Sequence, residues 1–490
     1  MINGMNSKSR NNSYALLGWW IGAIFIPCVW LLLVGAKNYP PPHIDDGGYI
    51  GAAINLYRGL GFVNTFCDSL HRWPFTEGYY CYLPAHSYIL AAWLKIFGLN
   101  SLSMRMFPAT CAMASSFLIY RFFSPSRFSI VAAIGIVACV LVFLGGTGLR
   151  PDSLGLLFFV AGLSAFESRK PLAFFSSNLS LAMGAISYAN VIYIGLLVTI
   201  GSAIYHCLSN PKERGLWLRL GIMAVMAYIV ATMFFLYFIH FSVADFWTGF
   251  EYSKQKGLAV VQAQFNIKNT YEAIKWSAVQ GAFLFLLGYL FLRSRKENAQ
   301  TKFTPIFIAV CYFALAFTCT SSISGSHIWA TGCALTGFYL IWNGSYAQSG
   351  VMLLTWFLFC GILIMAHGHY ILCDLLSDHR VDLRRNQSII YRLKASNPAT
   401  IYVDSYAMRE LYGYDAPPNV FDYCQSSLSG WLEPKSYEDI PADSIAVISV
   451  AYALPGHGAE QKRPLFGMLG PYICDNPYDL VVNDHRLKTH

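Results

Sequence analysis

Long apolar stretches, separated by short polar segments, run through most of this chain of 490 residues. The first one, Tyr14 to Val34, is long enough to cross a bilayer as a helix. It is too long for a signal-peptide core and no small-residue cleavage site follows it, so we interpret it as a retained span. Hydrophobic residues make up 55% of the chain and charged residues only 12%, whereas soluble domains carry about 25% charge. This pattern predicts an α-helical polytopic membrane protein.

Basic residues between the apolar stretches predict the orientation of the chain. Lys8 and Arg10 place residues 1–13 in the cytoplasm. Residues 14–375 then form a transmembrane domain of about 11 spans, with every basic loop on the cytoplasmic side. After the first span, the predicted spans are 106–123, 128–144, 154–166, two between 172 and 207, 216–241, 277–292, 303–320, 328–342 and 351–373. The net charge of +8 is therefore explained by short cytoplasmic loops, and no nucleic-acid partner is expected.

Residues 84–98 are apolar but short for a span. If they crossed the membrane, Arg121 and Arg127 would move to the external side and the charge pattern would invert downstream. We therefore expect a partly embedded helix within a first external loop that covers residues 36–105. Loops of this length are usually functional.

The composition changes at about residue 376, where the chain becomes polar and rich in proline. Three segments are typical of buried strands and one of a helix: 399–404, 443–450 and 478–482 for the strands, and 381–396 for the helix. Residues 376–490 are enough for a small α/β domain, and the number of spans places this domain on the external side.

Four cysteines fall in the two external regions, as Cys67 with Cys81 and Cys424 with Cys474. Two pairs in an oxidising compartment predict two disulfides. Four free thiols are the alternative.

An acidic pair, Asp45 and Asp46, follows the first span in the sequence HIDDGGYIGAAINLYRGLGF. Helical spacing of apolar residues predicts a helix that starts at this pair and lies in the membrane interface. Its apolar stripe comprises Ile50, Ala53, Ile54, Tyr57 and Leu60, and its opposite face Gly51, Asn55 and Arg58. A helix cap is the structural alternative, but one carboxylate is enough for a cap.

A second acidic motif, Arg150-Pro151-Asp152, is expected on the same external face. Asp152 can cap a helix that starts at Ser153, with Pro151 in its first turn. Two acidic loops at one membrane face, each followed by a helix, nevertheless indicate a shared site. Asp45, Asp46 and Asp152 are therefore the candidate catalytic carboxylates.

Basic side chains at the same face can hold a lipid phosphate. The candidates are Arg58, Arg150, Lys254 and Lys256. Snorkelling of the same side chains to the headgroups is the alternative. His367, His369 and His379 lack the spacing of a zinc motif, so no metal site is predicted there, although an Asp pair can also hold a divalent cation.

In this order, the motifs resemble those of GT-C glycosyltransferases. The resemblance is carried by the acidic pair after the first span, by LPAHSYILAAWLKIFGLNSLSMRMFPA and by RPDSLGLL, over about residues 14–170. It implies that Asp45 or Asp46 is the catalytic acid of the first loop, that Asp152 is the acid of the second, and that Arg58 lies near the donor phosphate. The chain departs from the family at Gly47-Gly48, so the assignment of the base stays between Asp45, which we prefer, and Asp46.

The family implies an inverting transfer of a sugar from a polyprenyl-phosphate donor to an acceptor that is a lipid, a glycan or a protein. The expected location is a bacterial inner membrane, with the active site facing the periplasm or exterior. A lipid-linked glycan polymerase or ligase is the first alternative. A transporter is the second, but the candidate spans carry few ionisable residues near the midplane.

Overall fold

The structure is a computed structural model of the whole chain. It describes residues 46–64, 78, 80, 82–123, 149–165, 168–188, 191, 195, 199, 200, 211–251, 388 and 391, together with six strands between 401 and 484.

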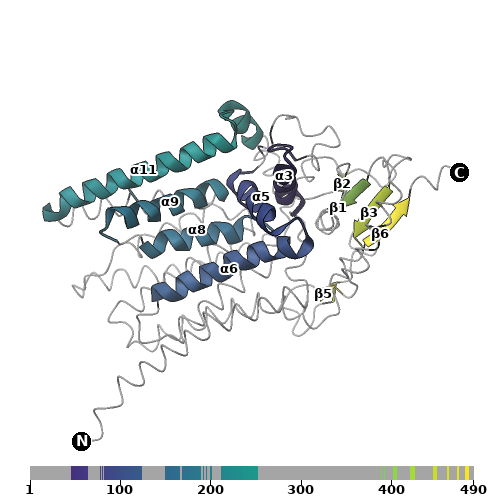
Figure 1. Cartoon of the computed structure of the whole chain (residues 1–490), viewed down its shortest axis with the longest axis horizontal. Helices are drawn as coiled ribbons and strands as arrows, with labels where there is room; N and C mark the ends of the chain where they lie inside the picture. Colours follow the sequence, from purple (N-terminus) through teal and green to yellow (C-terminus); the bar gives the residue numbers. More distant parts are fainter. Residues whose placement is uncertain are drawn as a thin grey trace, which may run out of the picture.

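Four helices lie side by side in the described part of the transmembrane domain (Figure 1). They are α6 (Ser101–Phe123), α8 (Asp152–Ala165), α9 (Pro171–Ser187) and α11 (Arg214–Phe238). Each packs against the next in that order, and a short turn makes α8 and α9 antiparallel neighbours. A single 3₁₀ turn, η2 (Pro211–Glu213), precedes α11.

Two shorter helices, α3 (Asp46–Arg58) and α5 (Ala85–Phe97), lie at one end of this bundle (Figure 1). The helix α3 packs on α5, and α5 contacts α6, α9 and α11. The Tyr88 hydroxyl of α5 donates a hydrogen bond to the carbonyl oxygen of Phe238 at 3.0 Å, where α11 ends. We call this end of the bundle the α3–α5 end.

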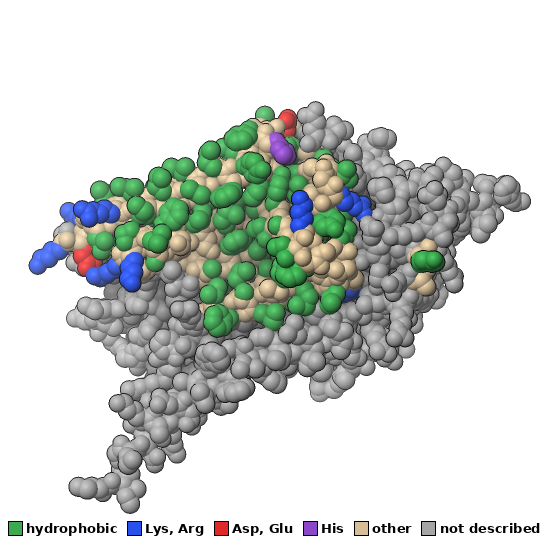
Figure 2. Space-filling model, viewed as in Figure 1, with side chains coloured by type: hydrophobic (Ala, Val, Ile, Leu, Met, Phe, Trp, Pro, Cys, Tyr) green, Lys and Arg blue, Asp and Glu red, His purple; other side chains and the backbone are tan. Residues whose placement is uncertain are grey.

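Basic side chains gather at the opposite end of the bundle (Figure 2). Arg169, in the turn between α8 and α9, forms an ion pair with Glu213 before α11, with 3.0 Å between Nη1 and Oε1. Lys170, Lys212 and Arg214 are exposed beside it. The described parts of two loops predicted to be cytoplasmic, 168–170 and 211–214, thus lie at the end opposite α3 and α5, as alternating spans require. Which side of a membrane each end faces stays a prediction.

The predicted spans that fall on described residues are helical. Span 106–123 is α6, 154–166 is α8 and 216–241 is α11, while α9 ends at the predicted turn near Tyr188. The helix α6 starts five residues early because the Asn100 side-chain oxygen accepts a hydrogen bond from the Ser103 backbone N–H at 2.7 Å, which caps it.

Among the described helices, α11 alone is both long and apolar enough to cross a membrane. Many of its large apolar side chains are exposed, which suits a helix facing lipid. The other predicted spans, 14–34, 128–144, 277–292, 303–320, 328–342 and 351–373, lie outside the described residues. The count of about 11 spans therefore stays a prediction.

The short apolar segment 84–98 is a helix, as predicted. It forms α5, whose 13 residues extend about 20 Å, too short to cross the hydrocarbon core. The C-cap of the helix is Gly98, whose φ of 83° lies in the left-handed region that favours glycine. Ile96 at its end is 74% exposed, next to exposed Phe97 and Leu102. This apolar surface favours the partly embedded placement, which stays a prediction.

The prediction that α3 is amphipathic is wrong. Gly51 and Asn55, assigned to a polar face, are buried, and so are Ile50, Ala53 and Ile54 on the other face. Leu60, assigned to the apolar stripe, lies beyond the helix and is 53% exposed. The start of α3 is therefore a packed core helix and does not lie with one face in water.

The C-terminal region contains a four-stranded sheet in the order β2-β1-β3-β6. The strand β1 is parallel to β2 and β3, and β6 is antiparallel to β3. The six strands are β1 (Ile401–Asp404), β2 (Val420–Cys424), β3 (Ile445–Ser449), β4 (Gln461–Lys462), β5 (Tyr472–Ile473) and β6 (Leu480–Asp484). The strands β4 and β5 pair separately.

The three predicted strands are confirmed as β1, β3 and β6, whereas β2 was not predicted. Ser388 and Tyr391 are helical, within the predicted helix 381–396. That residues 376–490 form an external α/β domain stays a prediction. So do both disulfides, because Cys67, Cys81 and Cys474 lie outside the described residues.

Candidate active site at the α3–α5 end of the bundle

The second acidic motif begins α8. Asp152 is the first residue of this helix and is 0% exposed. Its Oδ2 accepts a hydrogen bond from Nε of Arg150 at 3.1 Å, which makes a buried ion pair. Among the described residues, its Oδ1 has no hydrogen-bond partner. The carboxylate therefore pairs with Arg150 and does not cap the helix. The turn instead begins with the Pro151 carbonyl, which accepts from the Gly155 N–H at 2.8 Å.

An unpaired oxygen on a buried carboxylate is costly. Leaving a buried acceptor without a partner costs about 1–3 kcal/mol, and more for a charged group. Native structures rarely keep such an atom without a reason, and a ligand or a proton donor is a common one. The N-terminus of α8 therefore has the character of a functional site.

The first acidic motif begins α3. Asp46 is the first residue of the helix, and Asp45 lies just outside the described residues. One turn further, Tyr49 is buried. A side chain on Gly51 would collide with Asn64, because a Cβ there would lie 2.1 Å from the Asn64 Oδ1. The turn after α3 therefore folds back onto the helix, and the Asn55 amide fixes it by donating to the Val63 carbonyl at 2.8 Å.

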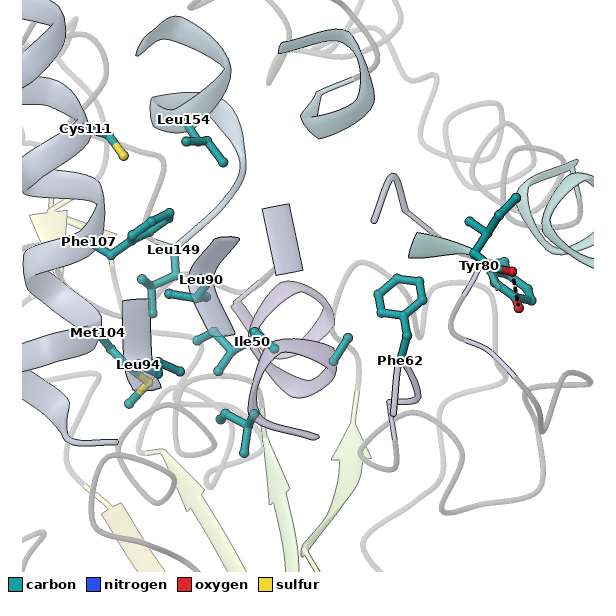
Figure 3. Close-up of a cluster of buried hydrophobic side chains, with 14 of the residues drawn as sticks. Ile50, Phe62, Tyr80, Leu90, Leu94, Met104, Phe107, Cys111, Leu149 and Leu154 are labelled. Carbon is teal, nitrogen blue, oxygen red and sulfur yellow. Dashed lines mark hydrogen bonds between the residues drawn. The ribbon is translucent and has the colours of Figure 1, made fainter. Parts of the chain in front are cut away.

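The two motifs are anchored in one apolar cluster. Leu149 and Leu154, which flank Asp152, belong to the same buried cluster as Ile50 and Ile54 of α3 (Figure 3). The cluster also takes in side chains from α5 and α6: Leu90, Leu94, Met104, Phe107 and Cys111. The start of α8 is thereby packed with the helix that the acidic pair begins. Close approach of Asp152 to Asp45 or Asp46 stays a prediction.

The four candidate phosphate ligands are placed unevenly. Arg150 lies next to a carboxylate at the α3–α5 end. Arg58 is the last residue of α3, about 18 Å along the helix axis from Asp46 at 1.5 Å per residue. Lys254 and Lys256 lie outside the described residues. Of the four, Arg150 is therefore the one that the structure places beside a candidate catalytic carboxylate, that of Asp152.

Two buried polar side chains at this end were not among the predicted site residues. Arg105, in the first turns of α6, is 1% exposed and donates to the Oγ and the carbonyl oxygen of Ser101. His86, in the first turn of α5, is also 1% exposed, and among the described residues neither of its ring nitrogens has a hydrogen-bond partner. Nothing in the spacing of either residue distinguishes it from an ordinary loop residue. In the sequence, only the motifs around these two residues indicated a functional region.

Burial lowers the pKa of the His86 imidazole from 6.5 to about 3, so the ring is neutral at physiological pH. Its ring packs edge-on against Tyr49 of α3 at 5.9 Å and against Phe107 of α6 at 5.8 Å, between ring centroids. Tyr82, half-buried, stacks on Tyr49 at 4.2 Å.

The described residues include no cluster of three or more His, Cys, Asp and Glu side chains able to hold a metal ion. A divalent cation held by the Asp45–Asp46 pair stays an alternative, because Asp45 is outside the described residues.

The sequence matches no protein-family model and no curated protein. Among solved structures, the chain is similar to the crystal structure of ArnT from Cupriavidus metallidurans bound to undecaprenyl phosphate. The identity is 14%, 97% of each chain is covered and the TM-score is 0.47. A likeness at this TM-score is too weak to assign a function, so the assignment depends on the residues of this chain.

Proposed function

We propose that this protein is an integral membrane glycosyltransferase of the GT-C type, which moves a sugar from a polyprenyl-phosphate donor to an acceptor at the external membrane face. One observation carries the proposal. The buried Arg150–Asp152 pair, with one carboxylate oxygen that has no partner among the described residues, is packed in the same apolar cluster as the helix that Asp46 begins.

The chemistry of the transfer needs a base and a cation. An acceptor hydroxyl attacks the anomeric carbon, its O–H proton passes to a carboxylate, and the bond between the anomeric carbon and the phosphate oxygen breaks. Direct attack inverts the anomeric centre, and the electron pair leaves with the polyprenyl phosphate. A positioned base contributes about 10²–10⁴-fold to such a step, and a cation stabilises the negative charge that develops on the phosphate.

We assign Asp45 as the base, with Asp46 as the alternative, and Arg150 as the first ligand of the leaving phosphate. Asp152 then holds the Arg150 guanidinium through its Nε, so that the charge is fixed in place before the donor binds. A guanidinium presents its N–H donors in a planar fork that matches phosphate oxygens. Arg58, Lys254 and Lys256 are the next candidates for the phosphate.

A glycan polymerase or ligase would use the same class of donor, and it is kept as the alternative acceptor reaction. A transporter is disfavoured by the placement of charge. In the described helices α6, α8, α9 and α11, the ionisable Asp, Glu, Lys and Arg residues all lie in the first two turns or the last turn. Transporters place such groups near the middle of the membrane.

The deciding experiment uses purified full-length protein and a panel of polyprenyl-phosphate sugars, with release of polyprenyl phosphate as the readout. We expect turnover of at least one donor, and loss of that turnover in Asp152→Asn. Glu213→Gln is the matched control, because it removes an ion pair at the other end of the bundle, and it should turn over like wild type. Absence of release with every donor and acceptor class, or equal rates for Asp152→Asn and Glu213→Gln, would overturn the proposal.

A further inference from the structure

His86 is a buried side chain whose polar atoms nothing in the described structure uses. Its ring is 1% exposed, and among the described residues neither Nδ1 nor Nε2 has a hydrogen-bond partner. Buried polar groups in native proteins are nearly always paired. Because an apolar ring of the same size would pack there without that loss, a histidine at this position needs a reason other than packing.

The surroundings of His86 are aromatic. Tyr49 of α3 and Phe107 of α6 both pack edge-on against the imidazole. Tyr82 stacks on Tyr49, with 4.2 Å between centroids. Exposure rises from His86 to Tyr49 and then to the half-buried Tyr82. This row of rings therefore leads from the buried imidazole toward the surface of the α3–α5 end.

The position of Tyr49 links this row to the acidic pair. Tyr49 lies three residues after Asp46, the first residue of α3, and thus about one helical turn along. His86, on a neighbouring helix, is therefore next to the turn of α3 that directly follows the candidate base.

The charge state of His86 limits the kinds of ligand group that its ring can bind. Burial keeps the imidazole neutral, since it lowers the pKa to about 3. A neutral imidazole has one N–H donor and one acceptor nitrogen, which complements a hydroxyl group. A phosphate offers only acceptors and a negative charge, so it is served better by a cation. Aromatic rings beside a hydroxyl partner also suit the apolar C–H faces of a sugar ring.

We propose that His86 is a specificity residue that hydrogen-bonds a hydroxyl group of the transferred sugar, with Tyr49 and Tyr82 beside the sugar ring. This inference rests on the proposed function, because it names the part of the donor that this side chain contacts. Both tyrosine rings shift when the sugar enters, because Tyr49 stands between Tyr82 and the imidazole in this row.

The test pairs stability with kinetics in purified full-length protein. His86→Phe keeps an aromatic ring and removes both nitrogens, while His86→Gln keeps a donor and an acceptor without the ring. Phe107→Leu alters the packing on the α6 side of His86 and serves as the matched control. We expect His86→Phe to unfold at a higher temperature than wild type, because an unpaired polar group has left the core, and yet to lose about ten-fold in kcat/KM for the donor. His86→Gln should recover part of that loss.

Deoxy donors identify the hydroxyl. Once the panel has shown which donor is used, analogues that lack one hydroxyl each are compared in wild type and His86→Phe. One analogue should lose about ten-fold in wild type and nothing further in His86→Phe, whereas Phe107→Leu should respond to every analogue as wild type does.

The outcomes separate the two proposals. If wild type turns over a donor but His86→Phe keeps the wild-type kcat/KM, or loses activity equally on every analogue, the inference about His86 is wrong and the proposed function stands. A lower unfolding temperature in His86→Phe also overturns it, because the nitrogens then have a structural partner. If wild type turns over no donor, the proposed function fails and the inference fails with it.

Discussion

Arg150 and Asp152 pair within one turn of chain, Nε to Oδ2 at 3.1 Å, with the carboxylate fully buried. Arg169 and Glu213 pair at a similar distance, 3.0 Å, with side chains that are 65% and 26% exposed. The two pairs lie at opposite ends of the bundle. Because the first pair is buried and the second is exposed, comparing them shows how burial changes the contribution of an ion pair to stability.

Removing one partner from each pair should have very different effects on stability. Arg150→Met leaves the Asp152 carboxylate buried without its partner, so the free energy of unfolding should fall by about 3–5 kcal/mol. Glu213→Gln removes an exposed pair and should cost less than about 1 kcal/mol. Thermal unfolding of the purified variants in one detergent measures both. Equal shifts in unfolding temperature would contradict the burial of Asp152.

The acidic pair should be needed for transfer. Asp45→Asn or Asp46→Asn, whichever removes the base, should lower the rate by about two to four orders of magnitude, the usual contribution of a general base. Protein yield and unfolding temperature should stay near wild type, which a transfer assay and a thermal scan check together. Full activity in both single variants and in the double variant would exclude the pair from catalysis.

The cations should act on the leaving phosphate. Because charge on the phosphate grows as the bond to the sugar breaks, a cation there helps the transition state more than bound donor. Arg58→Ala, Lys254→Ala and Lys256→Ala are therefore compared for kcat and for donor affinity. A larger loss in kcat than in affinity supports the role of the residue changed. Arg58, which lies at the far end of α3 from Asp46, should show only a small effect if Arg150 holds the phosphate.

Gly51 should resist substitution for a local steric reason. In Gly51→Ala, the new Cβ would lie 2.1 Å from the Asn64 Oδ1 and 2.7 Å from its Cγ, so the buried Asn64 must move, at a cost of about 1–3 kcal/mol. The double variant Gly51→Ala/Asn64→Gly should regain part of this loss. Gly221→Ala in α11 meets no atom within 4 Å and should be neutral or stabilising by up to about 1 kcal/mol. Unfolding temperatures of the three variants test this, and an unaffected Gly51→Ala would show that Asn64 does not pack against α3.

The stability of the protein should fall in mild acid partly because of His86. Its pKa is about 3 in the folded protein against 6.5 in an unfolded chain, so between these values the unfolded state binds a proton that the folded state does not. The contribution of neutral His86 is complete above pH 6.5 and decreases as the pH falls from 6.5 toward 3. His86→Phe should therefore lose less unfolding temperature than wild type between about pH 7 and pH 5. Parallel curves for the two proteins would mean that the imidazole protonates readily in the folded state.

The helix positions were predictable from the sequence because these helices form over long apolar runs and end where the runs end. The segment 84–98 was recognised as a helix too short to span, and α5 confirms the helix. The error in α3 has a physical cause. Small residues such as Gly51 and Ala52 carry almost no polarity signal, so a face built from them packs against protein as easily as it faces water.

The rest of the site depends on tertiary contacts that no local pattern contains. The pairing of Asp152 with Arg150 competes with helix capping, and both are compatible with the same three residues. No residue near His86 in the sequence stands at a spacing that indicates a hydrogen-bond partner. That its ring is enclosed without such a partner is seen only once α3 and α6 pack around it. The strand β2, VFDYC, has Asp422 at its centre, which interrupts its apolar run, whereas the apolar runs of β1, β3 and β6 are unbroken.

The hydrogen bond from Tyr88 to the Phe238 carbonyl joins residues 150 positions apart in the chain. A ribosome must therefore complete α11 before α5 can settle against it, long after α3 and α5 themselves have been synthesised. The packing of α5 against α11 is consequently among the later steps in the assembly of the described bundle during biogenesis. A nascent chain released before residue 238 would contain both acidic motifs and still lack one of the contacts that hold α5 in place beside them.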